Sequence, residues 1–348
     1  MTVDASIPPQ ATIRQVAADA GVSKTSVSRY FGGERERLSV GMQQRIQASA
    51  ERLGYRPNQM ARGLKGGHSR LIGMVMADIR NPFSIDVMHG AEQACREHGL
   101  SLVVCNTDND PAQEREHLAL LTSYRVEGLI INAAGHPSRE LSALADRGTP
   151  LVLLDRTLSD YDADVVALDN RQAIDAALNH LQTQGYRHLL YVSEPPSQAS
   201  SRQTRLERFH QQLETHQLSG TTVTLDLIDE TQRLDNAIDD FLADATHSDS
   251  PKAILCGNGN ITLAVARTLV RHGVELGNVG LMGIDELPWA ELVGPGITTL
   301  AQPTDLIGRA AIDTLLQRRE DKDGTLPSRH ILYHGRLNAR GSTQRHER

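Results

Sequence analysis

The spacing of apolar residues near the N-terminus predicts two short helices joined by a tight turn. Residues at the i, i+3, i+4, i+7 positions of one helical face are apolar: Ile13, Val16, Ala17 and Ala20. Thr12 is a good N-cap for this helix, and Gly21 supplies the turn. Ser23 can cap a second helix whose inner face carries Val27. The pattern therefore predicts a helix-turn-helix.

The outer face of the second predicted helix carries short polar and cationic side chains, namely Lys24, Thr25, Ser26, Ser28 and Arg29. Such groups are typical of a helix that reads base edges in the major groove of DNA. The alternative is a small helical hairpin packed within a larger domain, whose polar residues are merely solvated.

A third helix is expected over residues 40–53, with Ser39 as its N-cap and Gly54 after its end. Its inward residues are Met42, Ile46, Ala50 and Leu53. The segment Tyr55-Arg56-Pro57 then breaks the helical pattern. Residues 58–67, NQMARGLKGG, form a short amphipathic segment that is too short to be a stable helix alone.

From residue 71 onward, short apolar strands alternate with helical stretches, which predicts parallel sheets. Strands are expected at 71–77, 101–106, 128–132, 151–155, 188–193, 222–228, 252–257 and 279–285. Helices are expected at 85–98, 112–124, 138–147, 170–184, 203–215, 231–244 and 260–272. The two successive sets indicate two similar α/β lobes.

Ligands of such sheets bind outside the carboxyl ends of the strands, so the residues that directly follow the strands are candidates for a binding site. We expect these residues to converge on one cleft. They are Asn81 and Phe83 after the first strand, Arg156 after the fourth, Asn258 after the seventh, and Asp285 and Trp289 after the eighth.

The net charge is distributed unevenly along the 348 residues. The whole chain has a formal charge of −7, but residues 1–70 contain 11 Lys and Arg against 5 Asp and Glu, a net +6. The remainder contains 25 against 38, a net −13. A small basic module joined to a large acidic body is typical of a DNA-binding head whose body faces other partners.

Cysteine usage gives no indication of a disulfide framework or a metal site. Cys95, Cys105 and Cys256 are widely separated and form no C-x-x-C pattern. The sequence shows no export signal and no run of about 20 apolar residues, so we expect a cytoplasmic protein without a membrane partner. No cofactor and no metal are expected.

Three segments, AGVSKTSVSR, GYRPNQMARGLK and RLIGMVM, resemble the LacI/GalR family of bacterial transcription repressors. The resemblance covers nearly the whole chain. It implies a three-helix, all-α helix-turn-helix head at 1–57 and a hinge helix at 58–67. A two-lobed α/β body of the type I periplasmic-binding-protein kind, with parallel sheets, would follow at 68–340, and a polar tail at 341–348.

The resemblance also implies how DNA is bound. Lys24, Thr25 and Arg29 would face base edges in the major groove. Thr12, Ser23, Ser28 and Asn58 would contact phosphates or cap helices. Leu64 would wedge between base pairs in the minor groove, flanked by Ala61, Arg62 and Lys65. The alternative is an ordinary linker in which Leu64 packs on the body.

For the body, the resemblance implies effector contacts at Asp155, Arg205, Asn258 and Asp285. A sugar ring would stack on the aromatic faces of Phe83 and Trp289. Arg208 departs from the family pattern, which has glycine at this position, so it is expected to crowd or charge the pocket.

Five arginines fall near predicted strand ends or helix starts: Arg80, Arg156, Arg202, Arg205 and Arg208. Because a guanidinium suits a carboxylate in two-point contact, they favour an acidic sugar. The alternative is that several pair with the many surface carboxylates. Four further segments, RLIGMVMADIRNPFS, HGLSLVVCNTD, VSEPPSQASSRQ and VGPGITTLAQPT, are similar to repressors of gluconate and 2-ketogluconate utilisation.

Other function classes fit less well. The glycine-rich stretch 256–260 resembles a dinucleotide loop, but Thr262 replaces its third glycine, and no nucleophile and base are assembled. A sugar-acid enzyme or a transport-type binding protein without sequence-specific DNA binding remains the alternative. A turnover assay would reveal an enzyme, and a salt titration of DNA binding would exclude a transport protein.

The expected assembly is a homodimer on a pseudo-palindromic operator of double-stranded DNA. The tail from His334 shows no leucine heptad, so no tetramer is expected. Lobe closure around a sugar acid would move the two hinge segments and change operator affinity. Induction is the expected direction, although a corepressor would use the same parts in reverse.

Overall fold

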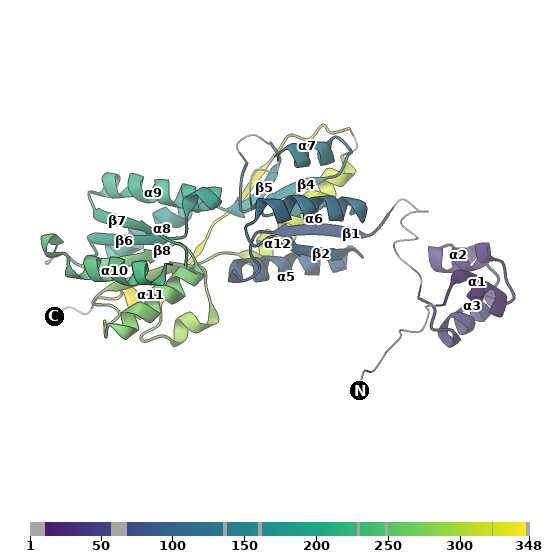
Figure 1. The fold of residues 1–348 in the computed structure, drawn as a ribbon, viewed down its shortest axis with the longest axis horizontal. Coiled ribbons are helices and arrows are strands. Elements are labelled where there is room, and N and C mark those ends of the chain that lie inside the picture. The colour runs from purple at the N-terminus through teal and green to yellow at the C-terminus, as the bar shows by residue number, and fades with distance from the viewer. Residues whose placement is uncertain are drawn as a thin grey trace. The chain divides into compact units, whose positions relative to one another are not determined.

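The computed structural model describes residues 11–56, 68–134, 138–158, 162–227, 230–247, 250–321 and 323–345. The chain forms two compact units, Met1–Ser69 and Arg70–Arg348. Within the described residues the first unit is helical, whereas the second contains two six-stranded sheets (Figure 1).

Residues 11–56 of the first unit, which we call the head, form three helices and one 3-10 turn: α1 (Ile13–Asp19), α2 (Lys24–Gly32), η1 (Arg35–Arg37) and α3 (Val40–Arg52). Thr12, Ser23 and Ser39 cap the helices, and each side chain accepts the backbone N–H three residues ahead. Gly21 turns the chain with φ of 63°, a conformation that glycine adopts without strain. The predicted caps and turn are confirmed.

The core of the head forms where the three helices meet. Val16, Val27 and Ile46 are fully buried, and Ala17, Ala20, Tyr30, Leu38 and Ala50 complete the cluster. The expected inner faces are therefore confirmed, with Tyr30 of α2 as an additional core residue. Arg35 lies over the Tyr30 ring at 4.3 Å, a cation–π contact that fixes the turn after α2.

The N-lobe of the second unit is built on a sheet with the strand order β11-β5-β4-β3-β1-β2. Its strands are β1 (Leu71–Met76), β2 (Ser101–Asn106), β3 (Leu129–Ile131), β4 (Leu151–Leu154), β5 (Asp164–Leu168) and β11 (His330–Tyr333). Helices α5 (Pro82–Glu97) and α12 (Thr304–Glu320) cover one face, and α6 (Pro111–Ser123) and α7 (Ser138–Ala145) cover the other (Figure 1).

The C-lobe repeats this plan with the order β12-β10-β9-β8-β6-β7. Its strands are β6 (His188–Ser193), β7 (Ser219–Thr224), β8 (Lys252–Cys256), β9 (Gly280–Ile284), β10 (Thr298–Ala301) and β12 (Arg336–Asn338). Helices α8 (Asn170–Thr183) and α9 (Ser200–His216) pack on one face, and α10 (Thr231–Ala243) and α11 (Gly259–Arg271) on the other. The paired strands are parallel except β12, which runs antiparallel to β10.

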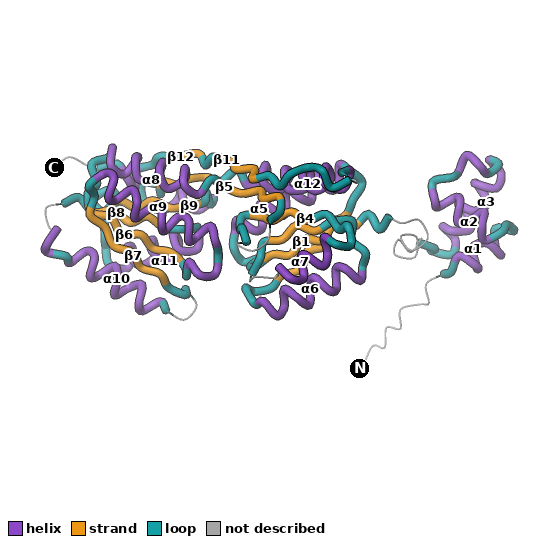
Figure 2. The backbone as a smooth tube through the Cα atoms, turned by 90° about the horizontal axis from the view of Figure 1, so that it is seen from above, coloured by secondary structure: helices purple, strands orange, loops and turns teal. Residues whose placement is uncertain are grey.

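Four short 3-10 turns complete the second unit: η2 (Pro196–Gln198), η3 (Ala245–His247), η4 (Pro288–Leu292) and η5 (Gly341–Thr343). The chain passes between the lobes at Asp169, at Gln302-Pro303 and at His334-Gly335 (Figure 2). As a result α12 and β11, which come late in the sequence, belong to the N-lobe.

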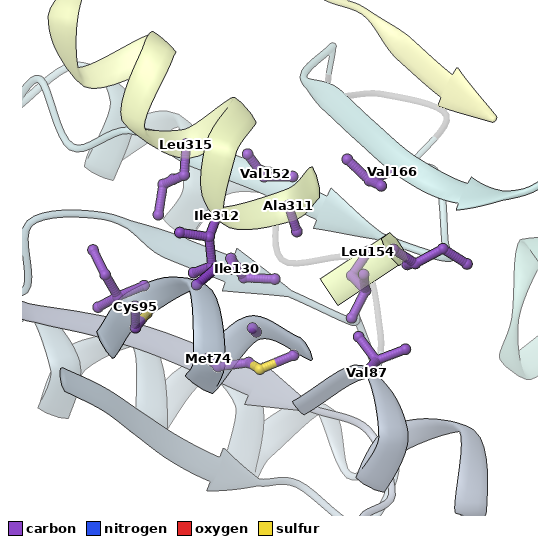
Figure 3. Packing of buried hydrophobic residues seen from close by; sticks show 14 of the residues in the cluster. Met74, Val87, Cys95, Ile130, Val152, Leu154, Val166, Ala311, Ile312 and Leu315 are labelled. Atoms are coloured by element: carbon purple, nitrogen blue, oxygen red, sulfur yellow. The ribbon is translucent and has the colours of Figure 1, made fainter. Parts of the chain in front are cut away.

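Helices α5 and α12 cross with their backbones in close contact. A Cβ added to Gly308 would lie 2.1 Å from the Val87 carbonyl oxygen, and one on Gly90 would lie 2.3 Å from the Asp305 carbonyl oxygen. Ile312 and Leu315 of α12 pack with Val87 and Cys95 of α5 over the sheet (Figure 3). Gly90 and Gly308 therefore allow the backbones of α5 and α12 to approach each other closely.

The predicted alternation of strands and helices in two lobes is confirmed, with shifted ends. Helices α5 and α9 each begin three residues earlier than expected, and β7 covers 219–224 instead of 222–228. The apolar pattern did not predict five elements: β5, β10, α12, β11 and β12.

Candidate functional site

The exposed face of α2 is the candidate DNA-reading surface of the head. Lys24, Thr25, Ser28 and Arg29 are all exposed, while Val27 and Tyr30 of the same helix are buried. The exposed residues occupy the first two turns of α2, where the N-terminal end of a recognition helix contacts bases.

Two of the expected phosphate contacts already serve as helix caps. Thr12 Oγ1 donates to Gln15 Oε1 at 2.9 Å, and Ser23 Oγ accepts from the Ser26 N–H at 3.0 Å. Both remain exposed. The remaining DNA candidates, Asn58, Ala61, Arg62, Leu64 and Lys65, lie outside the described residues.

A second candidate site lies where the carboxyl ends of strands from both sheets meet. Asp155 follows β4 of the N-lobe with φ of 62°, and Asp285 follows β9 of the C-lobe with φ of 82°. Non-glycine residues rarely adopt such angles, and this strain is concentrated at functional sites. The residues joined around these two carboxylates are called the interlobe cluster: Asp155, Arg156, Asn170, Glu194, Ser201, Arg202, Arg205, Asn258, Asp285 and Gln302.

The loop after β4 is tied to the start of α9 in the other lobe. Ser201 Oγ donates to Asp155 Oδ2 at 2.9 Å, and the Thr157 N–H donates to Ser200 Oγ at 2.8 Å. Arg156 Nη1 donates to the carbonyl oxygens of both Ala133 and Gln198, so this guanidinium also bridges the lobes. The same loop and the start of α9 line a pocket of about 360 Å³, a ligand-sized volume.

Two guanidinium groups of the cluster are buried against neutral oxygen atoms. Arg205 Nε donates to Asn170 Oδ1 at 2.7 Å and Arg205 Nη1 to the Gly257 carbonyl oxygen at 2.6 Å. Burial lowers the pKa of Arg156 to about 10. Neither Arg156 nor Arg205 forms an ion pair within 4.0 Å among the described side chains. Both are hydrogen-bonded to neutral oxygens, and the Asp155 carboxylate near Arg156 and the Asp285 carboxylate near Arg205 act on them only through space.

Asn258 is held between a helix terminus and a carboxylate. Its Oδ1 accepts the Ile261 N–H at 2.9 Å and so caps α11, while its Nδ2 donates to Glu194. Arg202 Nη2 donates to the same Glu194 carboxylate at 2.7 Å. Glu194 therefore satisfies two of the predicted effector contacts in this structure.

Asp285 is a buried carboxylate with two hydrogen-bond donors. Its Oδ2 accepts the Gly259 N–H at 2.9 Å, and its Oδ1 accepts Gln302 Nε2 at 2.6 Å. Burial raises the pKa of Asp285 above its ordinary value, although Arg205 and these donors oppose that shift. Because Gln302 lies in a crossover between the lobes, Asp285 connects the cluster to a hinge.

Three further predicted residues have structural roles in this fold. Asn81 Oδ1 accepts the Phe83 N–H at 3.1 Å and caps α5. Phe83 is 7% exposed within the N-lobe core, so the expected stacking face is covered. Trp289 lies in η4 and packs against the core of the C-lobe.

The alternative that several of the five arginines pair with carboxylates holds for three of them in this structure. Arg80 pairs with Asp78 at 3.0 Å, Arg202 with Glu194 at 2.7 Å, and Arg208 with Asp175 at 2.6 Å. Arg208 therefore neither crowds nor charges the pocket, because α8 supplies a carboxylate partner for it.

Sequence reasoning missed Asn170, Glu194, Ser201 and Gln302. Glu194 directly follows β6, so the same strand-end rule would have found it. Gln302 follows β10, a strand that the apolar pattern did not predict. Ser201 is the second residue of α9 and carries no signal of its own in the sequence.

One group of side chains with metal-ligand chemistry occurs within the described ranges, and it lies outside the interlobe cluster. It consists of His188, Asp244 and His247. His188 begins β6, whereas the cluster lies beyond the carboxyl ends of the C-lobe strands.

Comparison with known proteins identifies the family. Residues 12–58 match the model for bacterial regulatory proteins of the lacI family, and residues 69–333 match that for periplasmic binding proteins and the sugar binding domain of the LacI family. The chain belongs to the LacI family. It is therefore a transcriptional regulator with a DNA-binding head, not an enzyme.

Relatives of this LacI-family regulator cover almost the whole chain. The HTH-type transcriptional regulator PtxS of Pseudomonas aeruginosa is 49% identical over 341 residues, 95% of each chain. PtxS of Pseudomonas putida is 49% identical over 96% of each chain. The HTH-type transcriptional regulator KdgR of Bacillus subtilis is 39% identical over 90% of this chain and 92% of the relative.

Solved structures agree with the fold. The lac repressor dimer bound to operator and the anti-inducer ONPF superposes with a TM-score of 0.80 at 22% identity, covering 96% of this chain and 99% of that chain. The CelR–cellobiose complex gives a TM-score of 0.67 at 21% identity over 96% of this chain and all of that one. In the part of the chain that the structure describes, no helix is long and apolar enough to span a membrane.

Proposed function

We propose that this LacI-family regulator is a cytoplasmic repressor that binds a pseudo-palindromic operator as a homodimer. A sugar acid, 2-ketogluconate or gluconate, binds the interlobe cluster and changes operator affinity. The single observation that carries the sugar-acid assignment is the pair of buried guanidinium groups, Arg156 and Arg205, whose hydrogen-bond acceptors among the described residues are all neutral oxygen atoms.

Unpaired polar atoms in the cluster support a ligand with hydroxyl groups. Asp155 Oδ1 and Gln302 Oε1 are buried acceptors without a hydrogen-bond partner among the described residues. Arg156 Nε is a buried donor in the same state. Buried polar groups are normally paired, so a polyol that donates to the two oxygens and accepts from Arg156 completes the site.

The carboxylate of the acid distinguishes it from a neutral sugar. A charge-assisted hydrogen bond from a buried guanidinium to a carboxylate is about twice as strong as one between neutral groups. The acid therefore gains an interaction with Arg156 or Arg205 that glucose lacks.

The head supports sequence-specific DNA binding. Four polar or cationic side chains of α2, Lys24, Thr25, Ser28 and Arg29, are exposed together on a helix that is anchored by Val27 and Tyr30. Net positive charge in the first 70 residues adds attraction to phosphates.

Exposed apolar side chains in the C-lobe support dimerisation. Leu263 and Val270 lie seven residues apart on the same side of α11 and are 40% and 64% exposed. Leu292 in η4 is 79% exposed. A second copy of the chain would cover these apolar side chains.

Isothermal titration of the full chain with 2-ketogluconate, gluconate and glucose tests the effector assignment. At least one acid should bind about ten times more tightly than glucose. Arg156→Gln should reduce this ratio of the affinity for the acid to the affinity for glucose. Arg80→Gln, which alters an arginine paired with Asp78, is the matched control. Equal affinity for glucose and both acids would contradict the proposal.

A further inference from the structure

The group of His188, Asp244 and His247 lies at the opposite end of the C-lobe sheet from the interlobe cluster. His188 is the first residue of β6 and is 2% exposed. Asp244 follows α10 directly, and His247 ends the short turn η3. Two chain segments, the start of β6 and residues 244–247, therefore bring two imidazoles and a carboxylate to one place.

The potential ligand atoms are within the reach of a single ion. Asp244 Oδ2 lies 2.9 Å from His247 Nδ1 and 3.4 Å from His188 Nε2, and the three ligand atoms lie within 4.8 Å of one another. Around a tetrahedral ion with ligands at about 2.0–2.2 Å, neighbouring ligand atoms are about 3.3 Å apart. The two separations measured from Asp244 Oδ2 are close to this value.

The hydrogen bonds of His188 leave its second nitrogen facing a carboxylate. Ser219 Oγ donates to the Arg187 carbonyl oxygen at 3.3 Å, so it accepts a hydrogen bond from the His188 Nδ1–H at 2.8 Å. His188 Nε2 then presents a lone pair to Asp244 Oδ2. Two electron-rich atoms at this separation favour a cation between them.

The nearest ammonium group does not supply that cation. The Lys252 ammonium donates to the carbonyl oxygens of Leu242 and Asp244 and is thus held by backbone groups.

We propose that His188, Asp244 and His247 bind a divalent transition-metal ion, with Zn²⁺ as the best match. Two imidazole nitrogens and one carboxylate oxygen are the ligands that zinc and its first-row neighbours prefer. Three protein ligands leave at least one position for water, as in an open zinc site.

The surrounding groups fit the outer shell of a metal site. Ser219 holds the His188 ring in the orientation that aims Nε2 at Asp244, and the Thr246 N–H donates to Asp244 Oδ1 at 2.9 Å. Such partners fix the tautomer and orientation of metal ligands. Asp244 Oδ2 is hydrogen-bonded to His247 Nδ1 at 2.9 Å, and an ion bound between these two atoms would replace that bond.

Binding requires one rearrangement. The rings of His188 and His247 are stacked, with centroids 4.1 Å apart and planes 4° from parallel, whereas a metal ion lies close to the plane of each imidazole that binds it. His247 lies on a short turn with about a third of its side chain exposed, so its ring is the one that turns. The ion would then link η3 to β6 through His247 and His188.

Titration of the metal-free, tag-free full chain with ZnCl₂ by calorimetry tests the proposal. One Zn²⁺ per chain is expected, with a rise in Tm, and Co²⁺ should show the visible absorption of a low-coordinate site. Asp244→Asn and His247→Gln should each weaken Zn²⁺ affinity at least tenfold.

The matched control is His272→Gln, which alters a histidine of the same lobe that pairs with Asp239 at 2.9 Å but belongs to no group of three. Its Zn²⁺ affinity should equal that of the unaltered chain. His247 is partly exposed, so its variant should fold even where a His188 variant does not. No binding by the unaltered chain, or equal binding by His247→Gln, would overturn the proposal.

Discussion

The hydroxyl group of Ser201 donates a 2.9 Å hydrogen bond to Oδ2 of Asp155 and thereby joins the C-lobe to the N-lobe. Arg156 and Thr157 make further bonds to the same end of α9, through the Gln198 carbonyl oxygen and Ser200 Oγ. The two lobes are therefore hydrogen-bonded to each other on this side of the interlobe cluster. A ligand that pairs with the free Oδ1 of Asp155 acts at the same junction.

Ser201→Ala should lower the free energy of unfolding by about 1–3 kcal/mol, because neither oxygen of the Asp155 carboxylate would then have a hydrogen-bond donor among the described residues. Urea unfolding at pH 7 measures the loss. Thr204→Ala is the control, since the Thr204 hydroxyl bonds only to the Ser200 carbonyl within α9. Equal midpoints for Ser201→Ala and the unaltered chain would show that the bond does not stabilise the body.

Gly308→Ala should destabilise the body by about 1–3 kcal/mol, because the added Cβ would lie 2.1 Å from the Val87 carbonyl oxygen and push α12 away from α5. Thermal unfolding of the body measures the effect. At Gly41, an exposed glycine of α3, an added Cβ meets nothing within 4 Å, so Gly41→Ala should leave the body unchanged. If Gly308→Ala unfolds at the same temperature as the unaltered chain, the close helix crossing is not required.

Asp285→Asn should stabilise the body at neutral pH, and the gain should shrink as the pH falls. The raised pKa means that the folded state holds the Asp285 proton more tightly than the unfolded chain, so its ionised form opposes folding at pH 7. Each pKa unit corresponds to about 1.4 kcal/mol. Gln302 can flip so that its unpaired Oε1 accepts from the new amide.

The measurement for this prediction is the unfolding free energy of both proteins at several pH values between 7 and 4. The difference between the proteins should fall as the pH passes downward through the raised pKa of Asp285. A difference that stays constant, or that grows toward acid, would contradict the assigned cause of the shift.

Lys24→Ala and Arg29→Ala should each weaken operator binding by about 1–3 kcal/mol if the side chain contacts a base edge, and relax the sequence preference there. Fluorescence anisotropy on operator and on scrambled DNA measures both effects. Arg96→Ala removes an exposed cation of α5, outside the head, and is the charge-matched control. Equal weakening on both DNA sequences would limit these residues to phosphate contacts.

The sequence predicts the head well because its signals are local. Thr12, Ser23 and Ser39 each bond a backbone N–H three residues ahead, so caps and helices can be read within one short window. Asn258 and Asp285 could be placed at strand ends by the same kind of reasoning, whereas Asp155 was named as a contact by the family resemblance. Because ligands bind at the carboxyl ends of parallel strands, these strand-end positions indicated one shared binding cleft.

The partners of these residues were less accessible to sequence reasoning. Arg205 bonds to Asn170 and Gly257, and Arg208 bonds to Asp175, across distances in sequence that no local pattern encodes. Phe83 looked like an exposed aromatic because it follows a strand, but the start of α5 turns it into the core. The return of α12 to the N-lobe depends on its glycine crossing with α5, which becomes visible only in three dimensions.

The most direct test of the central claim is operator affinity of the full chain measured with and without 2-ketogluconate or gluconate, at one fixed salt concentration. The account predicts that at least one acid changes the Kd for operator by fivefold or more, while glucose changes it little and Arg156→Gln reduces the response. The same Kd for operator with and without saturating acid would contradict it.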